Sequence, residues 1–200
     1  MTAAHFAEQA LRLGRPWRYD VVTIGFPGLV LHGKPAAEPG NLGSGWVDYD
    51  FRKAFDRPVK ILNDAVMQAL GSYKGGRMLF LGLGTGVGST LVVDGMLFEL
   101  ELGNLRYSRS RTLHQVLRKA ALDRLQKRER SKLVGDIALN LGRAFIADHV
   151  VIGGGAAEYI SDLPKGVRRG SNRNARIGGF RIWDYNSQRP VITKHAVVLV

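Results

Sequence analysis

The most constraining feature of the sequence is the run Gly82-Leu83-Gly84-Thr85-Gly86-Val87-Gly88, in which glycine alternates with other residues. It separates two apolar segments, residues 78–83 and 89–93, which we expect to be strands. No Gly-Lys-Ser/Thr follows, so the run is not a Walker A loop, and a strand follows where a dinucleotide fingerprint needs a helix. A glycine-rich turn lets backbone N–H groups and the Thr85 hydroxyl approach phosphate oxygens closely. We therefore favour phosphate binding over a tight hairpin whose glycines only permit positive φ.

Short apolar segments alternate with helix-periodic segments, which is typical of an α/β architecture. The expected strands are residues 19–25, 29–32, 59–62, 78–83, 89–93 and 149–152, with a polar loop at 33–45 and a hairpin turn at Asp94-Gly95. The expected helices are residues 2–14, a short one within 46–55, one from Asn63, and two within 112–147 that separate near Arg130. In the polar tail from Pro164, only residues 177–183 are expected to pack.

The charge is strongly basic and unevenly distributed. The chain has 29 Lys and Arg against 17 Asp and Glu, a net charge of +12, and residues 104–132 hold a large part of the excess. Such a surface attracts nucleic acid, nucleotides or polyphosphate, although a solvated basic helix face explains it equally well. Tyr107 is the one aromatic residue of that segment, so it gives poor support to stacking on single-stranded nucleic acid. A nucleic-acid partner is therefore the least favoured interpretation.

Other global features restrict the protein class. No apolar run approaches the roughly 20 residues that span a bilayer, so no membrane partner is expected. The first residues resemble a helix rather than a signal peptide, and the absence of cysteine excludes disulfides and thiolate metal sites. We expect a soluble cytoplasmic protein. The histidines, at positions 5, 32, 114, 149 and 195, lack metal-ligand spacing, so no residue is assigned to a metal.

Three further groups of residues have both a structural and a functional interpretation. Asn63-Asp64 follow a predicted strand, where an aspartate can accept a substrate proton and an asparagine can bind a sugar, although both residues also cap helices. Glu101 and Asn104 flank a predicted glycine turn and could hold vicinal hydroxyls, or belong to a solvated loop. Gly153, Gly154 and Gly155 follow the strand at 149–152 and could admit a nucleotide base or ribose, or allow a close turn.

Taken in order, several motifs resemble those of ROK-family sugar kinases, and the polyphosphate-glucokinase-like branch in particular. They are GFPG (25–28), NLGSGW (41–46), ILNDA (61–65), LGLGTGVGS (81–89), DG (94–95), ELGN (101–104) and VVIGGG (150–155). The resemblance implies a two-lobed, actin-like ATPase (ribonuclease H-like) fold. Residues 1–62 would form a partial N-terminal α/β lobe and residues 63–200 the C-terminal lobe.

The resemblance also implies roles for individual residues. Asp64 would be the general base that activates the sugar 6-hydroxyl, and the remaining site residues would bind the substrates. Those expected to contact the sugar are Asn63, Glu101, Asn104, Gly45 and Trp46. Those expected at the phosphoryl donor, ATP or polyphosphate with Mg²⁺, are Gly84, Thr85, Gly86, Gly153, Gly154 and Gly155. A homodimer is also implied.

The chain departs from the family pattern at three points. It has no Asp-x-Gly-Gly-Thr phosphate loop, so the N-terminal lobe is expected to be incomplete. The sugar motif ends in Asn104 instead of histidine. The further sugar-binding glutamate is not found, because Arg106 and Tyr107 occupy that region. The predicted function is a glucokinase-like sugar kinase. The alternative is a catalytically impaired or truncated relative that binds sugar or nucleotide without turnover.

Overall fold

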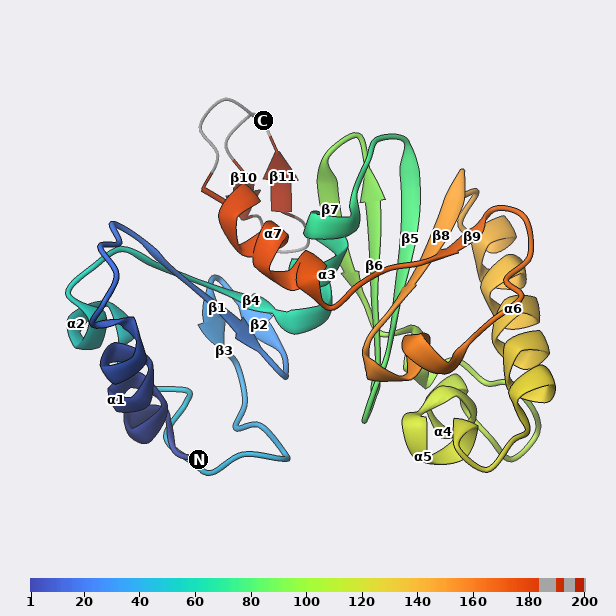
Figure 1. Ribbon diagram of the computed structural model, residues 1–200, viewed down its shortest axis with the longest axis horizontal. Coiled ribbons are helices and arrows are strands. Elements are labelled where there is room, and N and C mark those ends of the chain that lie inside the picture. The colour runs from blue at the N-terminus through green and yellow to red at the C-terminus, as the bar shows by residue number, and fades with distance from the viewer. Residues whose placement is uncertain (184–189, 193–196, 200) are drawn as a thin grey trace. The chain divides into compact units, whose positions relative to one another are not determined.

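The computed structural model describes residues 1–183, 190–192 and 197–199 (Figure 1). The chain forms two compact units, Met1–Asp64 and Ala65–Val200. None of the helices in the described ranges is long and apolar enough to cross a membrane.

The N-terminal unit is a small α/β unit built on two parallel strands. β1 and β4 pair in register, with Ile24 opposite Ile61, and the chain passes between them through α2. The Thr2 side chain accepts a hydrogen bond from the backbone of His5 at the start of α1, which is a typical N-cap. The elements are α1 (Ala3–Gly14), β1 (Val22–Phe26), the hairpin strands β2 (Val30–Leu31) and β3 (Lys34–Pro35), α2 (Phe51–Phe55) and β4 (Val59–Asn63).

Aromatic side chains form the centre of this unit. The Trp46 ring lies 5.3 Å from the Phe6 ring, 5.5 Å from the Phe26 ring and 5.9 Å from the Phe51 ring, measured between centroids. Trp46 is only 3% exposed. Because buried aromatic side chains contribute large apolar areas, this cluster supplies much of the stability of a unit with so few strands.

The C-terminal unit is built on a seven-stranded mixed sheet with the order β10-β11-β7-β6-β5-β8-β9. β5, β8 and β9 run parallel, whereas the remaining pairs are antiparallel. The strands are β5 (Arg77–Leu83), β6 (Val87–Val93), β7 (Met96–Leu100), β8 (His149–Gly153), β9 (Val167–Arg169), β10 (Pro190–Ile192) and β11 (Val197–Leu199).

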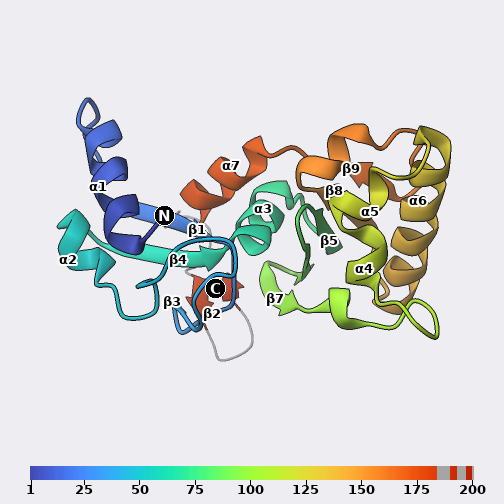
Figure 2. The same cartoon turned by 90° about the horizontal axis from the view of Figure 1, so that it is seen from below.

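Helices cover both faces of this sheet, as Figure 2 shows. One face packs against α4 (Leu113–Leu117), α5 (Lys119–Leu122) and α6 (Lys127–Ala144), and alternate strand residues such as Leu79, Leu81 and Ile152 enter that core. The opposite face carries α3 (Asp64–Ser72) and α7 (Arg173–Arg181). Two short 3-10 helices, η1 (Leu102–Asn104) and η2 (Gly155–Tyr159), follow strands of the sheet.

The helices α3 and α7 cross at very short range. A side chain at Gly71 would collide with the backbone carbonyl of Asn174, and one at Gly178 would collide with that of Met67. Arg181 then donates hydrogen bonds to the carbonyls of Leu70 (2.9 Å) and Tyr73 (2.9 Å). Two segments about one hundred residues apart are therefore fixed to each other by glycine contacts and by a guanidinium at the end of α3.

Most predicted elements are present, and most of the differences lie in the second half of the chain. The region predicted as two helices separated near Arg130 contains three, and α6 begins before that residue because Gln126 and Glu129 form a capping box. The tail has a strand, β9, that was not predicted. Within residues 177–183, Phe180 is 79% exposed while Ile182 is buried, so that segment packs on one side only. The predicted loop at 33–45 also begins with strand β3.

Candidate functional site

The N-terminal unit contributes the residues at the end of β4. Asn63 is the last residue of the strand, and its side-chain amide donates a hydrogen bond to the Gly28 carbonyl (3.0 Å), which ties the strand to the GFPG turn. Asp64 is the first residue of α3 and is exposed. A carboxylate at the start of a helix is electrostatically favourable, and this one is also accessible to a substrate.

Gly45 and Trp46, also in the N-terminal unit, have different surroundings. Gly45 adopts a positive φ of 87° and is exposed. The Trp46 backbone N–H donates to the Glu38 carboxylate at 3.1 and 3.2 Å, and the indole lies in the aromatic core. The packing of the Trp46 indole thus holds the loop in place, and the Glu38 carboxylate fixes its backbone by accepting the Trp46 N–H.

The predicted donor-binding glycines meet at one edge of the C-terminal sheet. β5 and β8 are parallel neighbours with Gly82 opposite Gly153, so the loop after β5 and the glycines after β8 leave the sheet side by side. Thr85 is exposed at the tip of the first loop, and the Gly84 N–H already donates to the Gly86 carbonyl (3.0 Å). Polar groups beyond the carboxyl ends of parallel strands are the usual setting of a ligand site in α/β proteins.

Gly154 joins the two glycine segments. It has a φ of 81°, and a side chain there would collide with the backbone carbonyl of Leu83. Its N–H donates to the side-chain carbonyl of Gln68 on α3 (3.3 Å). Only glycine satisfies both the dihedral angle and the close approach at this position.

The ELGN turn packs against the same region. The Ser89 hydroxyl donates to the Leu100 carbonyl (2.7 Å) and accepts from the Leu102 N–H (3.1 Å), which fixes the backbone on both sides of Glu101. The Asn104 N–H donates to the Glu101 carbonyl (3.0 Å), and the side chains of both residues are exposed.

His114 lies between the ELGN turn and the glycine loop. A side-chain carbon at Gly86 would lie 3.6 Å from His114 Cε1, and one at Gly103 would lie 3.4 Å from His114 Cβ. The backbone N–H of Lys119 donates to the Gly84 carbonyl (2.7 Å), so the α4–α5 segment holds the loop from the outside. The sequence gives no sign of this position, because His114 lacks metal-ligand spacing to the other histidines. The Thr112–Gln115 capping box would have placed it in the first turn of a helix.

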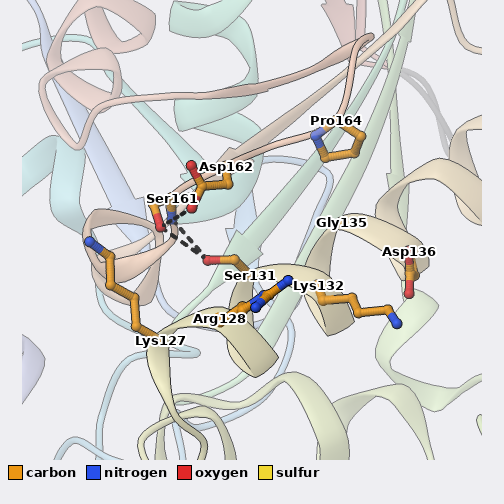
Figure 3. A pocket seen from close by; sticks show the side chains of 9 residues that line it. All are labelled: Lys127, Arg128, Ser131, Lys132, Gly135, Asp136, Ser161, Asp162 and Pro164. Atoms are coloured by element: carbon orange, nitrogen blue, oxygen red, sulfur yellow. Dashed lines mark hydrogen bonds between the residues drawn. The ribbon is translucent and has the colours of Figure 1, made fainter.

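A basic groove runs along α6 in the same unit, with a volume of about 590 Å³. Figure 3 shows Ser131 joined to Ser161, with Lys127 and Lys132 on either side of them. The groove is lined by Lys127, Arg128, Ser131, Lys132, Gly135, Asp136, Ser161, Asp162 and Pro164.

The predicted site residues thus fall into two groups. Gly45, Trp46, Asn63 and Asp64 belong to the N-terminal unit, and the remaining ones belong to the C-terminal unit. Within the described ranges, no three His, Cys, Asp or Glu residues gather in a metal-binding group, and His195 lies outside those ranges.

Comparison with known proteins identifies the fold. No protein-family model matches the chain, and no curated protein matches it in sequence. The chain is similar to the inorganic polyphosphate/ATP-glucomannokinase from Arthrobacter sp. strain KM, with 24% identity, a TM-score of 0.71, and coverage of 88% of this chain and 79% of that chain.

Two further solved structures illustrate the range of functions that this fold carries. The ROK family glucokinase from Streptomyces griseus, solved with glucose and AMPPNP, is 15% identical, with a TM-score of 0.65 and coverage of 90% of this chain and 88% of that chain. A ROK family transcriptional regulator, a homolog of the E. coli MLC protein, is 18% identical, with a TM-score of 0.58 and coverage of 88% and 65%. The predicted α/β, actin-like ATPase fold is therefore confirmed, and the chain shares it with the ROK sugar kinases.

Proposed function

We propose that the chain is a glucokinase-like sugar kinase, which transfers a phosphoryl group from ATP or polyphosphate to the 6-hydroxyl of glucose or a related hexose. The observation that carries this proposal is the convergence of the loop after β5, the glycines after β8 and the ELGN turn at one edge of the C-terminal sheet. Phosphoryl transfer depends mainly on positioning and charge stabilisation, so a preformed phosphate-binding loop is its main requirement.

In this proposal Asp64 accepts the proton of the sugar 6-hydroxyl while that oxygen attacks the terminal phosphorus of the donor. The bond from phosphorus to the bridging oxygen breaks, and the shortened donor leaves with the electron pair. The exposed Thr85 hydroxyl and the loop beside it bind the donor, and Glu101 and Asn104 bind sugar hydroxyls. Asn63 acts by holding the GFPG turn against β4.

Mg²⁺ would enter with the donor. In phosphoryl-transfer sites this ion is commonly bound by one or two carboxylates together with phosphate oxygens, so it does not need a cage of three carboxylates. Because Asp64 is assigned as the base, the ion would be held mainly by the phosphate oxygens of the donor. When bound, the ion neutralises charge on the transferred phosphates.

The basic groove of α6 supports polyphosphate as a donor besides ATP. Lys127, Arg128 and Lys132 are exposed along one side of the helix, where a chain of phosphates can contact several cations in succession. Asp136 and Asp162 on the rim oppose them in part.

A second candidate function is sugar or nucleotide binding without turnover. Asn104 favours it, because an amide cannot become cationic as the histidine of the family motif can. A transcriptional regulator has a similar fold, so this architecture also occurs in a protein described as a regulator.

The test is a glucose phosphorylation assay with Mg²⁺ and, separately, ATP and polyphosphate. The Asp64→Asn variant should lose about 10²- to 10⁴-fold of the rate, the range for removal of a general base. The Lys127→Gln/Arg128→Gln/Lys132→Gln variant should lose activity with polyphosphate and keep it with ATP. Binding of glucose by a folded protein that forms no glucose 6-phosphate would favour the second function.

A further inference from the structure

The N-terminal unit has a pocket of its own at the C-terminal end of α1. Its volume is about 540 Å³. None of the residues assigned above to the sugar or donor site lines it. The lining residues are Leu11, Gly14, Arg15, Trp17, Arg18, Tyr19, Asp20 and Arg57.

An ordered, exposed tryptophan is the most unusual member of this pocket. Trp17 is 71% exposed, although its backbone N–H is fixed by a hydrogen bond to the Gly14 carbonyl (2.9 Å). Gly14 has no side chain and lies against the Tyr19 ring, which is half-buried and forms an apolar wall. A large aromatic ring on a fixed turn is typical of a binding surface, because it offers contact area at little entropic cost.

Three guanidinium groups line the same pocket as the indole. Arg57 comes from the segment before β4 and is held in place, since its Nε donates to the Tyr19 carbonyl (3.3 Å) and its Nη1 to the Asp56 carbonyl (2.6 Å). Within the described part of the chain, Arg15 and Arg18 form no ion pair. Arg57 also forms an ion pair with Asp56 (3.4 Å), so that with Asp20, the one carboxylate among the lining residues, three cations and two anions give this region a net charge of +1.

Helix stabilisation explains only part of this arrangement. Cations near the C-terminus of α1 interact favourably with the helix dipole, which accounts for Arg15. It accounts neither for an exposed indole nor for Arg57, which another segment brings to the same place.

We propose that this pocket binds a nucleoside phosphate. The base stacks on Trp17, the guanidinium groups of Arg15, Arg18 and Arg57 bind the phosphate, and the Asp20 carboxylate accepts a hydrogen bond from a ribose hydroxyl. One exposed indole face accommodates one base, so a single nucleotide fits better than a run of stacked bases. All lining residues belong to the N-terminal unit, so the proposal does not depend on the proposed kinase function.

The test measures protection of Trp17 from acrylamide quenching during titration with AMP. The background is Trp183→Phe, which leaves Trp17 and the 3% exposed Trp46 as the tryptophans, so that the accessible emission comes from Trp17. Adenosine, inorganic phosphate, single-stranded oligonucleotides of increasing length and anionic phospholipid vesicles serve as the other arms.

We expect AMP to protect Trp17, and adenosine and phosphate each to bind at least tenfold more weakly. In calorimetry, Trp17→Ala and Arg15→Gln/Arg18→Gln should each remove this site or weaken it at least tenfold, whereas Phe180→Ala, which removes another exposed ring, should leave it unchanged. The absence of protection by AMP overturns the proposal, as does equal affinity for phosphate alone. An affinity that rises steeply with oligonucleotide length would overturn the proposal and show that the pocket is part of a nucleic-acid surface. Protection of Trp17 by vesicles alone would overturn it and show that the pocket is part of a membrane-binding surface.

Discussion

Two adjacent residues of β6, Ser89 and Thr90, test the hydrogen bonding near Glu101. Removal of their hydroxyl groups is expected to change the stability of the fold in opposite directions. Ser89 and Thr90 are 2% and 0% exposed. The Ser89 hydroxyl bridges the Leu100 carbonyl and the Leu102 N–H, whereas the Thr90 hydroxyl has no hydrogen-bond partner among the residues that the structure describes. Removal of the first hydroxyl therefore leaves two backbone groups without a partner, and removal of the second eliminates a buried polar group that nothing compensates.

The magnitudes follow from the cost of an unpaired buried polar group, about 1–3 kcal/mol. Ser89→Ala should destabilise the C-terminal unit by about that amount, and Thr90→Val, which keeps the shape, should stabilise it by about 1 kcal/mol. For a chain of this size, 1 kcal/mol corresponds to about 2–4 °C in Tm. We therefore expect Tm to fall with Ser89→Ala and to rise by a few degrees with Thr90→Val.

The assay is thermal and urea unfolding of the full chain, combined with glucose titration. Ser89→Ala should also weaken glucose binding, because it releases the backbone on both sides of Glu101, while Thr90→Val should leave glucose binding unchanged. Loss of stability in Thr90→Val would refute the reasoning, because it would mean that the threonine hydroxyl is satisfied. Unchanged stability in Ser89→Ala would show that the bridge contributes nothing.

Substitutions at Gly154, His149 and His114, with their controls, test other parts of the chain. Gly154→Ala should destabilise the fold by about 2 kcal/mol or more in urea unfolding, because its positive φ and its contact with the Leu83 carbonyl both exclude a side chain, whereas Gly155→Ala, with open space around it, should change stability by less than about 0.5 kcal/mol. Burial, and then the charge of Arg168, lower the pKa of His149 below its usual 6.5. As pH falls, the unfolded chain therefore takes up this proton before the folded chain does, so stability should decline below about pH 6.5. Unfolding measurements at a series of pH values should show a smaller decline in His149→Gln. Because His114 lies beside Gly86 of the proposed donor loop, we expect its imidazole to donate a hydrogen bond to a donor phosphate. His114→Ala should then raise the KM for the donor about tenfold, the effect of losing one hydrogen bond to a charged group, with partial recovery in His114→Gln; an unchanged donor KM would assign His114 to packing alone.

The sequence predicted those elements whose signals are local. The strands on both sides of the glycine run, the Asp94-Gly95 turn and the helix that begins at Asp64 follow from alternation, turn chemistry and capping, all of which act over a few residues. β9 was missed because its three residues have no alternating pattern, and it is a strand only because β8 offers a parallel edge.

In the candidate site, too, the residues with a local sequence signal could be predicted, whereas those placed by tertiary contacts could not. The glycine segments could be found in the sequence because only glycine permits their backbone geometry. The position of His114 beside Gly86 depends on how α4 packs over β6, and the burial of Trp46 depends in part on two aromatic partners from distant segments, Phe6 and Phe26. Such contacts come from tertiary structure and leave no short-range pattern.

The crossing of α3 and α7 sets a practical boundary for fragments of this protein. α7 covers the sheet face beside α3, and Arg181 supplies donors for carbonyls that the end of α3 leaves open. A fragment that starts with the C-terminal unit but ends before Arg173 lacks α7. It would expose both the α3 surface around Gly71 and these carbonyls. Expression of the C-terminal unit alone should therefore give soluble protein only when the cloned segment extends past the buried Ile182.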